Sequence, residues 1–357
     1  MSEKSAKKSG FDIHKITGHR LFMPIVCLLI VLLVNVFSAK DFFTFSIVEG
    51  HLSGWIITVI NRASELVILS IGMTLVTAAS GGQDISVGAV MAVAAAVCCQ
   101  LLSGGKVSTE TLAMPIIVAA LAGILVAALC GAFNGFLVAK LNIQPMVATL
   151  ILYTAGRGIA QLVTKGQITY VRVDSYKIMG GYLGPIPTPI VFAIGAIIVA
   201  WLVLNKTALG LYIESVGVNS NAARLVGLNS TKIKFLTYVI CGVLSGVAGI
   251  VASSRIYSAD ANNIGLNLEM DAILAVALGG NILGGGKFNL MGSVIGAYTI
   301  QALTTTLYAF SVPSDQLPVY KAIVVIIIVV LQSPVFKSVL SKAKARPKKV
   351  KLQGGEQ

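Results

Sequence analysis

The sequence has few charged residues for its length: Asp, Glu, Lys and Arg make up 11% of 357 residues, whereas hydrophobic residues make up 56%. The mean hydropathy is +0.87. A soluble domain of this length has no core large enough to bury so much apolar side chain. The composition therefore excludes a soluble globular protein and predicts an all-α polytopic membrane protein.

The sequence also lacks the patterns of a metal site, a disulfide framework and a nucleotide site. None of its three histidines lies in an apolar run, and its five cysteines all do, without metal or disulfide spacing. The Gly284–Lys287 stretch is not a phosphate loop, because Asn281 replaces the first Gly and Phe288 the final hydroxyl. We expect no cofactor and no metal in this chain.

The net charge of +13 is concentrated at the two ends of the chain, where five basic residues precede the first apolar run and seven follow the last. No aromatic residues are interleaved with them, which argues against nucleic-acid binding. Basic residues that flank membrane helices are typical of the cytoplasmic side and attract anionic lipids. Residues 1–20 and 337–357 are therefore predicted to be cytoplasmic tails of a membrane domain that spans residues 21–336.

A full crossing needs about 20 apolar residues, and the chain has ten candidate spans, an even number that agrees with two cytoplasmic ends. Residues 41–61 are predicted to lie outside, with Ser46–Ile60 as an amphipathic surface piece. The spans are Leu21–Phe37, Ala63–Ser80, Ile85–Leu102, Leu112–Ala139, Met146–Val163, Pro189–Leu204, Phe235–Ser253, Glu269–Leu283, Met291–Phe310 and Leu317–Leu331.

Several spans are short or interrupted by glycine, notably Met146–Val163 and the segment that starts at Glu269. Such segments in corresponding parts of two halves are typical of transporters with broken helices. The sequence predicts two loosely repeated halves on either side of residues 205–234. Gly-x-x-x-Gly pairs predict close contacts between helices; they are Gly131 with Gly135, Gly242 with Gly246, and Gly292 with Gly296.

Asp84 stands between two spans in the phrase Gly82-Gln83-Asp84-Ile85-Ser86-Val87. A carboxylate near hydrocarbon costs a few kcal/mol unless it reaches water or a partner. Asp84 is therefore expected beside a transport path or as a cap that accepts free backbone N–H groups of the next helix, and the two roles do not exclude each other.

The cytoplasmic loop 205–234 contains a second feature. Asn219 or Ser220 can cap a short helix and Gly227 can end it, which leaves about one and a half turns between them. The short helix is expected to be either a docking element for a soluble partner or a solvated connector. Its Ala222-Ala223-x-x-x-Gly227 spacing resembles the ATPase-docking loop of ATP-binding-cassette importers, although Asn221 stands where that motif has Glu.

The resemblance extends over residues 20–335. Phrases 82–88, 143–150, 258–263 and 269–276 resemble the permease subunits of bacterial sugar importers of the ribose type. Within that group, 143–167 and 259–280 are most similar to galactofuranose permeases. The resemblance implies a multi-pass inner-membrane permease and three kinds of partner: a periplasmic sugar-binding protein, a second permease (itself or a sister subunit) and a cytoplasmic cassette ATPase that uses ATP and Mg.

The resemblance and the residue chemistry together suggest three sets of candidate residues. Neutral polyols need hydrogen-bonding groups along their path, although the acidic members could instead cap helices. The ATPase-coupling set is Asn221, Ala222, Ala223, Arg224 and Gly227; the substrate-path set is Gln83, Asp84, Gln144, Thr149, Asn262, Asn263 and Asp271; the binding-protein set is Arg62, Arg255 and Asp260.

Alternative functions remain at this stage. The cargo could be ribose, another pentose or a furanosyl signalling molecule. An ion-coupled secondary transporter would also show broken helices and buried carboxylates, and Asp84, Arg157 and Asp271 could serve in its ion site. An intramembrane enzyme is disfavoured because no His lies in any span.

Overall fold

The computed structural model describes residues 21–38, 42–48 and 50–332, so both predicted tails lie outside the described residues. The described part contains thirteen helices. They are α2 (Phe22–Ser38), α3 (Trp55–Ser80), α4 (Val87–Leu102), α5 (Ile116–Ala139), α6 (Pro145–Val163), α7 (Asp174–Lys177), α8 (Thr188–Lys206), α9 (Leu209–Val218), α10 (Ser220–Leu225), α11 (Ser230–Arg255), α12 (Leu268–Leu278), α13 (Leu290–Ala309) and α14 (Leu317–Gln332).

Seven short strands form three small sheets. In the first sheet β1 pairs antiparallel with β2, in the second β4 pairs parallel with β3 and antiparallel with β7, and in the third β5 pairs antiparallel with β6. The strands are β1 (Ser46–Val48), β2 (His51–Ser53), β3 (Ser108–Thr109), β4 (Thr169–Val171), β5 (Tyr182–Leu183), β6 (Ile186–Pro187) and β7 (Ser258–Ala259).

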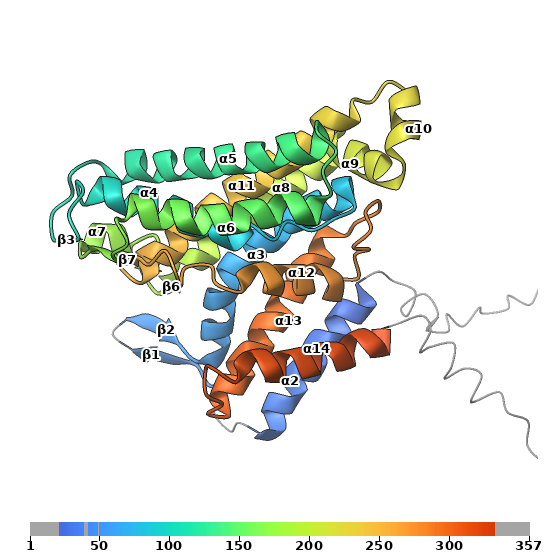
Figure 1. The fold of residues 1–357 in the computed structure, drawn as a ribbon. Coiled ribbons are helices and arrows are strands. Elements are labelled where there is room, and N and C mark those ends of the chain that lie inside the picture. Colours follow the sequence, from blue (N-terminus) through green and yellow to red (C-terminus); the bar gives the residue numbers. More distant parts are fainter. Residues whose placement is uncertain (1–20, 39–41, 49, 333–357) are drawn as a thin grey trace, which may run out of the picture.

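Different elements lie at the two ends of the helix bundle. The strands and α7 gather toward one end, here named the strand end, whereas α9 and α10 lie at the opposite end, named the α10 end (Figure 1). Each of the ten predicted spans coincides with a helix, and α3, α5, α6, α8 and α11 are long and apolar enough to cross a membrane. The prediction of an all-α polytopic membrane protein is confirmed.

Helix α3 lies at the centre of the bundle. Nearly every residue from Ala63 to Ala79 is buried, and the helix packs against α8, α11, α12 and α13. Helix α4, which is rich in alanine, is buried almost as completely. A helix that is apolar on all faces belongs inside a bundle, whereas less than a third of the most apolar stretch of α5, α6 and α8 is buried within the described residues.

Small residues allow α5 and α11 to approach closely, as the Gly-x-x-x-Gly spacing predicts. A Cβ atom at Gly131 would overlap the carbonyl oxygen of Tyr238, and one at Gly242 would overlap that of Ala127. The third pair makes the same kind of contact, since Gly292 meets Gly279 and Gly296 meets the Ala275 carbonyl of α12. Backbone proximity of this kind is how helices associate in lipid.

Residues 46–60 correct one prediction. They do not form one continuous piece: β1 and β2 pair as a hairpin, and α3 already begins at Trp55. Alternating Ser and apolar residues at positions 46 and 47, followed by a Gly50 with φ +80°, favour a hairpin. The start of α3 is therefore eight residues earlier than the predicted Ala63.

The chain is broken between α11 and α12. Strand β7 lies at the strand end beside β4, where Thr169 bonds Gln100 near the end of α4 (3.2 Å). Gly265 instead packs against Gly88 at the start of α4. Twelve residues separate Gly88 from Gln100, or about 18 Å at 1.5 Å per residue. The segment after β7 thus re-enters the bundle before α12 begins.

The predicted span Glu269–Leu283 is therefore correct in position but not in extent. Helix α12 has 11 residues and ends at Leu278, because the glycine-rich stretch 279–286 follows it as a turn. It is a half-length helix whose first turn begins inside the bundle. The prediction of broken helices is confirmed here, whereas the repeat of the two halves stays a prediction.

The α5–α11 contact leads to a stability prediction. Gly131→Ala should destabilise the protein by about 1–3 kcal/mol, since the added methyl group overpacks a backbone contact. Gly195→Ala is a matched control, because nothing lies within 4 Å of a Cβ at that helical position. Thermal unfolding of both variants in the same detergent would measure the difference. Equal melting temperatures would contradict the packing interpretation.

Candidate functional site

A cavity of about 720 Å³ lies between α3, α11, α12, α13 and α14. Its volume is within the usual range for small-molecule sites. We name it the charged cavity because five of its lining side chains are acidic or basic: Arg62, Glu65, Arg255, Asp271 and Lys321. Its other polar lining residues are Asn263, Asn267, Gln301, Thr304, Tyr308 and Ser314, and the rest of the lining is apolar.

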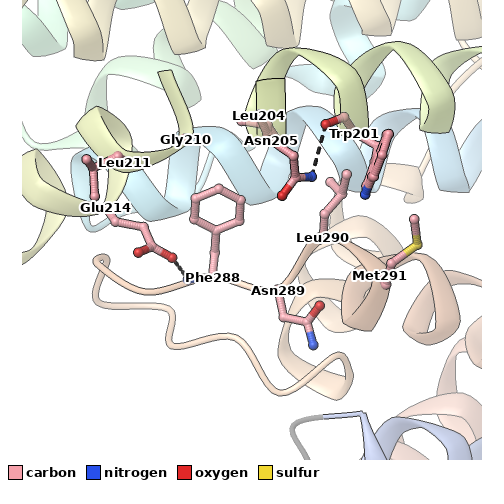
Figure 2. Close-up of a pocket in the computed structure, with 10 residues that line it drawn as sticks. All are labelled: Trp201, Leu204, Asn205, Gly210, Leu211, Glu214, Phe288, Asn289, Leu290 and Met291. Carbon is pink, nitrogen blue, oxygen red and sulfur yellow. Dashed lines mark hydrogen bonds between the residues drawn. The ribbon is translucent and has the colours of Figure 1, made fainter. Parts of the chain in front are cut away.

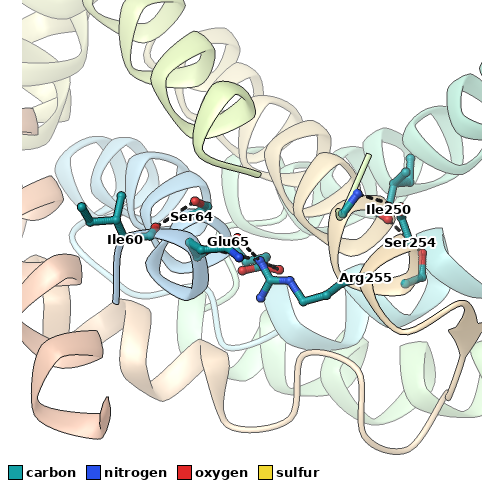
Figure 3. Close-up of polar contacts among 9 residues, drawn as sticks. Ile60, Ser64, Glu65, Ile250, Ser254 and Arg255 are labelled. Carbon is teal, nitrogen blue, oxygen red and sulfur yellow. Dashed lines mark hydrogen bonds and ion pairs between the residues drawn. The ribbon is translucent and has the colours of Figure 1, made fainter. Parts of the chain in front are cut away.

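One wall of the charged cavity is an ion pair between the two halves of the chain. Arg255 at the end of α11 lies 3.0 Å from the Glu65 carboxylate of α3 (Figure 3). The same guanidinium donates to the backbone and side-chain oxygens of Asn61 at 3.0 and 3.1 Å. Glu65 is only 5% exposed, so its charge depends on this partner.

The opposite wall is a second ion pair. Lys321 of α14 lies 2.7 and 2.9 Å from the two carboxylate oxygens of Asp271, in the first turn of α12. Both side chains are about one-sixth exposed, 15% for Lys321 and 16% for Asp271. This pair joins the half-length helix to the last span.

Arg157 of α6 holds the re-entrant segment in place. Its Nη1 donates to the carbonyl oxygens of Ala261 (2.9 Å) and Ile264 (2.5 Å). Three buried atoms nearby have no hydrogen-bond partner: Nε and Nη2 of Arg157 and Oε2 of Glu269. Glu269 is 1% exposed in the first turn of α12, so a buried carboxyl group and the partly buried guanidinium of Arg157 lie at the start of this helix.

Three predicted residues lie together in a turn at the strand end: Asn262 and Asn263 of the substrate-path set and Asp260 of the binding-protein set. Asp260 accepts hydrogen bonds from the backbone N–H groups of Asn262 (2.9 Å) and Asn263 (3.2 Å). Asn262 in turn accepts from Gln161 of α6 at 2.6 Å. Asp260 thus caps a turn of the re-entrant segment, and Asn263 lines the charged cavity, as do Arg62, Arg255 and Asp271.

The remaining four path residues lie elsewhere. Asp84 is 3% exposed, and it accepts hydrogen bonds from the Ser86 backbone (2.9 Å), the Ser86 hydroxyl (2.6 Å) and Asn134 of α5 (3.5 Å). The backbone donor is Ser86, the residue just before α4, so Asp84 stabilises the turn that leads into this helix. Thr149 accepts from the Ile85 N–H at 3.1 Å.

Gln83 and Gln144 lie toward the α10 end. Gln83 donates to the Leu283 carbonyl at 3.2 Å, which joins the turn after α3 to the glycine-rich turn after α12. Gln144 is exposed and precedes α6. The predicted path residues therefore occupy two regions, and only Asn263 and Asp271 line the charged cavity.

The short helix in loop 205–234 forms as its caps predict. The Asn219 side chain accepts from the N–H groups of Asn221 and Ala222, both at 3.0 Å, and Gly227 has φ +86° after the helix ends. The loop also contains α9 and is shorter than predicted, because α8 extends to Lys206 and α11 begins at Ser230.

The outward face of α10 differs from the expected one. Asn221, Ala222, Arg224 and Gly227 are exposed, but Ala223 is 4% exposed and packs against Ile213, Val216 and Ile233. Its small side chain therefore lets α10 sit on its own protein. The apolar side chains that face solvent are Leu225 (89% exposed) and Val226 (76% exposed), which sequence reasoning missed.

An apolar groove of about 420 Å³ lies beside α10, between α9 and Lys287. A second hollow of about 410 Å³ lies next to it between α8, α9 and the start of α13, where the Phe288 ring projects between Glu214 and Leu290 (Figure 2). The Phe288 N–H donates to Glu214 at 3.5 Å. The groove and the hollow meet at Glu214, so the loop before α13 contacts the α9–α10 unit.

Sequence reasoning missed Glu65 and Lys321 as cavity residues. An ionisable residue inside a predicted span is the signal that could have found them, since Glu65 lies in α3 and Lys321 in α14. Within the described residues, no three His, Cys, Asp or Glu side chains lie together as a metal site would require.

Comparison with known proteins agrees with this architecture. Residues 55–332 match the family model described as the permease component of the branched-chain amino acid transport system. The galactofuranose transporter permease protein YtfT of Escherichia coli K12 is 45% identical over 328 residues, which cover 91% of this chain and 94% of that protein.

Two further relatives are named for other sugars. The fructose import permease protein FruF of Bifidobacterium longum is 36% identical, with 94% of this chain and 93% of that protein covered. The ribose import permease protein RbsC of E. coli K12 is 35% identical, with 77% and 84% covered. These findings confirm the resemblance to permeases of the ribose type, and the chain belongs to this family of transport permeases.

Proposed function

We propose that the chain is the permease subunit of an ATP-driven importer that passes a monosaccharide, galactofuranose or a related sugar, into the cytoplasm. It lies in the bacterial inner membrane with both ends cytoplasmic. A periplasmic binding protein delivers the sugar, and a separate cassette ATPase uses ATP and Mg. The observation that carries the proposal is the 45% identity to a galactofuranose permease over 94% of its length.

The charged cavity supports an uncharged cargo. Its acidic groups Glu65 and Asp271 are paired with Arg255 and Lys321. The first turn of α12 already carries Glu269 and Asp271, whose charges complement the partial positive charge of a helix N-terminus. A polyol finds carboxylate oxygens in the cavity that accept from hydroxyl groups and Asn side chains that donate to them.

The open side of the charged cavity supports pairing with a second permease. The re-entrant segment exposes Asn267 beside the half-length helix, two residues after Gly265, whose contact with Gly88 lies about 18 Å from the strand end by the helical rise of α4. Irregular backbone and exposed amides do not face lipid at such depth. A second permease, a copy of this chain or a sister subunit, would cover them and enclose the path.

The α10 end supports docking of the ATPase. Leu225 and Val226 project from a capped helix beside the apolar groove, and Arg224 lies exposed next to them. Exposed apolar side chains on a short rigid helix fit a partner's groove. The contact set is therefore Asn221, Ala222, Arg224, Leu225 and Val226, whereas Ala223 and Gly227 shape the helix.

Reconstitution tests the cargo. Vesicles that contain the chain, its cassette ATPase and its permease partner should take up labelled galactofuranose when the binding protein and ATP are present. Ribose and fructose serve as competitors because two relatives are named as import permeases for these sugars. If ribose or fructose were taken up in preference to galactofuranose, that sugar would be assigned as the cargo. Uptake driven by an ion gradient without ATP would overturn the proposal.

The Asp271–Lys321 pair leads to a second prediction. Asp271→Asn should lower uptake about 10-fold or more, since leaving a mostly buried ammonium unpaired costs upwards of ~1.4 kcal/mol. The double variant Asp271→Asn/Lys321→Met should recover part of the uptake because no unpaired charge remains. Asp315→Asn changes an exposed carboxylate beside α14 and is the control. A double variant no better than Asp271→Asn would contradict the pairing argument.

The docking helix leads to a third prediction. Leu225→Asp should weaken ATPase binding about 30-fold, the loss of ~2 kcal/mol typical of an interface anchor, while the protein still inserts. Val107→Asp is the control, because Val107 is also exposed (51%) but lies at the strand end. Co-purification of the ATPase with each tagged variant measures the effect. If both variants recovered the same amount of ATPase, α10 would not be part of the ATPase contact.

A further inference from the structure

Two β-hairpins at the strand end are joined into one platform. Leu52 of β2 donates its N–H to the Pro185 carbonyl at 3.1 Å. His51 Nδ1 lies 3.0 Å from the Gly184 carbonyl, and the His51 ring stacks on Tyr182 with centroids 4.2 Å apart. Hairpins 46–53 and 182–187 therefore hold each other in position. We name them together the hairpin platform.

The hairpin platform exposes apolar side chains. Ile47 is 73% exposed and Leu183 61% exposed, and Phe45, which leads into β1, is 60% exposed. Side chains alternate between the two faces of a strand. Ile47 shares one face with its cross-strand partner Leu52, whereas Ser46 and Ser53 lie on the other. The described residues of both hairpins include no Lys, Arg, Asp or Glu; Glu49 at the turn lies outside the described residues.

The apolar side chains of the platform are continuous with helix faces that contact lipid. Strand β6 runs directly into α8, on which Val191 and Ile194 are each 48% exposed. Strand β2 runs into α3, whose first residue Trp55 is 38% exposed and stacks on Phe42. Aromatic side chains with one apolar and one polar end prefer the boundary between lipid and water.

We infer that the hairpin platform lies in the lipid–water interface of the leaflet at the strand end and inserts its Ile47 face into the lipid. In Figure 1 the β1–β2 hairpin projects from the bundle near the helix ends. Among the described residues of the platform the exposed apolar side chains have no charged neighbours, and such a surface suits lipid, which is always present. A soluble partner that binds and leaves would instead need polar and charged complementarity. This inference does not depend on the cargo or on the ATPase.

Spin labelling tests this inference on the full-length protein in phospholipid vesicles. Nitroxides are attached at Ile47→Cys and at Ser46→Cys, the matched control on the opposite face of the same strand. The unsubstituted protein gives the background, since four of its five cysteines are buried. Molecular oxygen concentrates in lipid, whereas a nickel chelate stays in water.

The ratio of oxygen to nickel accessibility should be several-fold higher at position 47 than at position 46. Equal, water-like ratios at both positions would overturn the inference. So would a water-like signal at position 47 that becomes protected when the binding protein is added, because the platform would then be a protein-docking surface. Size-exclusion profiles like those of the unsubstituted protein confirm that each labelled variant is folded.

Discussion

The structure depends on one constraint: a non-helical backbone inside a membrane must find its hydrogen bonds within the protein. Segment 256–267 breaks the span between α11 and α12, and Arg157 meets this constraint by donating to the Ala261 and Ile264 carbonyls. The contact of Gly265 with Gly88 then sets the segment against α4. Because the break is stabilised in this way, α12 begins inside the bundle and the charged cavity has a polar wall.

The same constraint explains why the charges are paired. Glu65 and Asp271 lie in the bundle, where an unpartnered carboxylate would be costly, and each has a basic partner on a different helix. The two pairs tie α3 to α11 and α12 to α14. They therefore serve the packing and at the same time place oxygen and nitrogen atoms along the wall of the cavity.

Periodicity and composition predicted the positions of all ten spans, the caps of α10 and the glycine contacts, because each depends on residues close in sequence. The cavity could not be predicted in the same way, since Lys321 meets Asp271 across 50 positions. The partners of Asp84 could not be predicted from the sequence either. Its burial cost was correctly recognised, but only the structure shows that Ser86 and Asn134 meet it.

The α10 end and the charged cavity are joined by continuous contacts. A Cβ at Gly217 of α9 would overlap the Ala78 carbonyl of α3, and that same carbonyl accepts from the Gly286 N–H at 2.9 Å. Gly286 belongs to the turn between α12 and α13, and Glu214 holds the next part of it through Phe288. Such close backbone contacts leave little room for α9, α3 and the turn between α12 and α13 to move past one another. A displacement of α10 by a bound ATPase would therefore reach the turn that ends α12, and through this 11-residue helix the Asp271–Lys321 wall of the cavity.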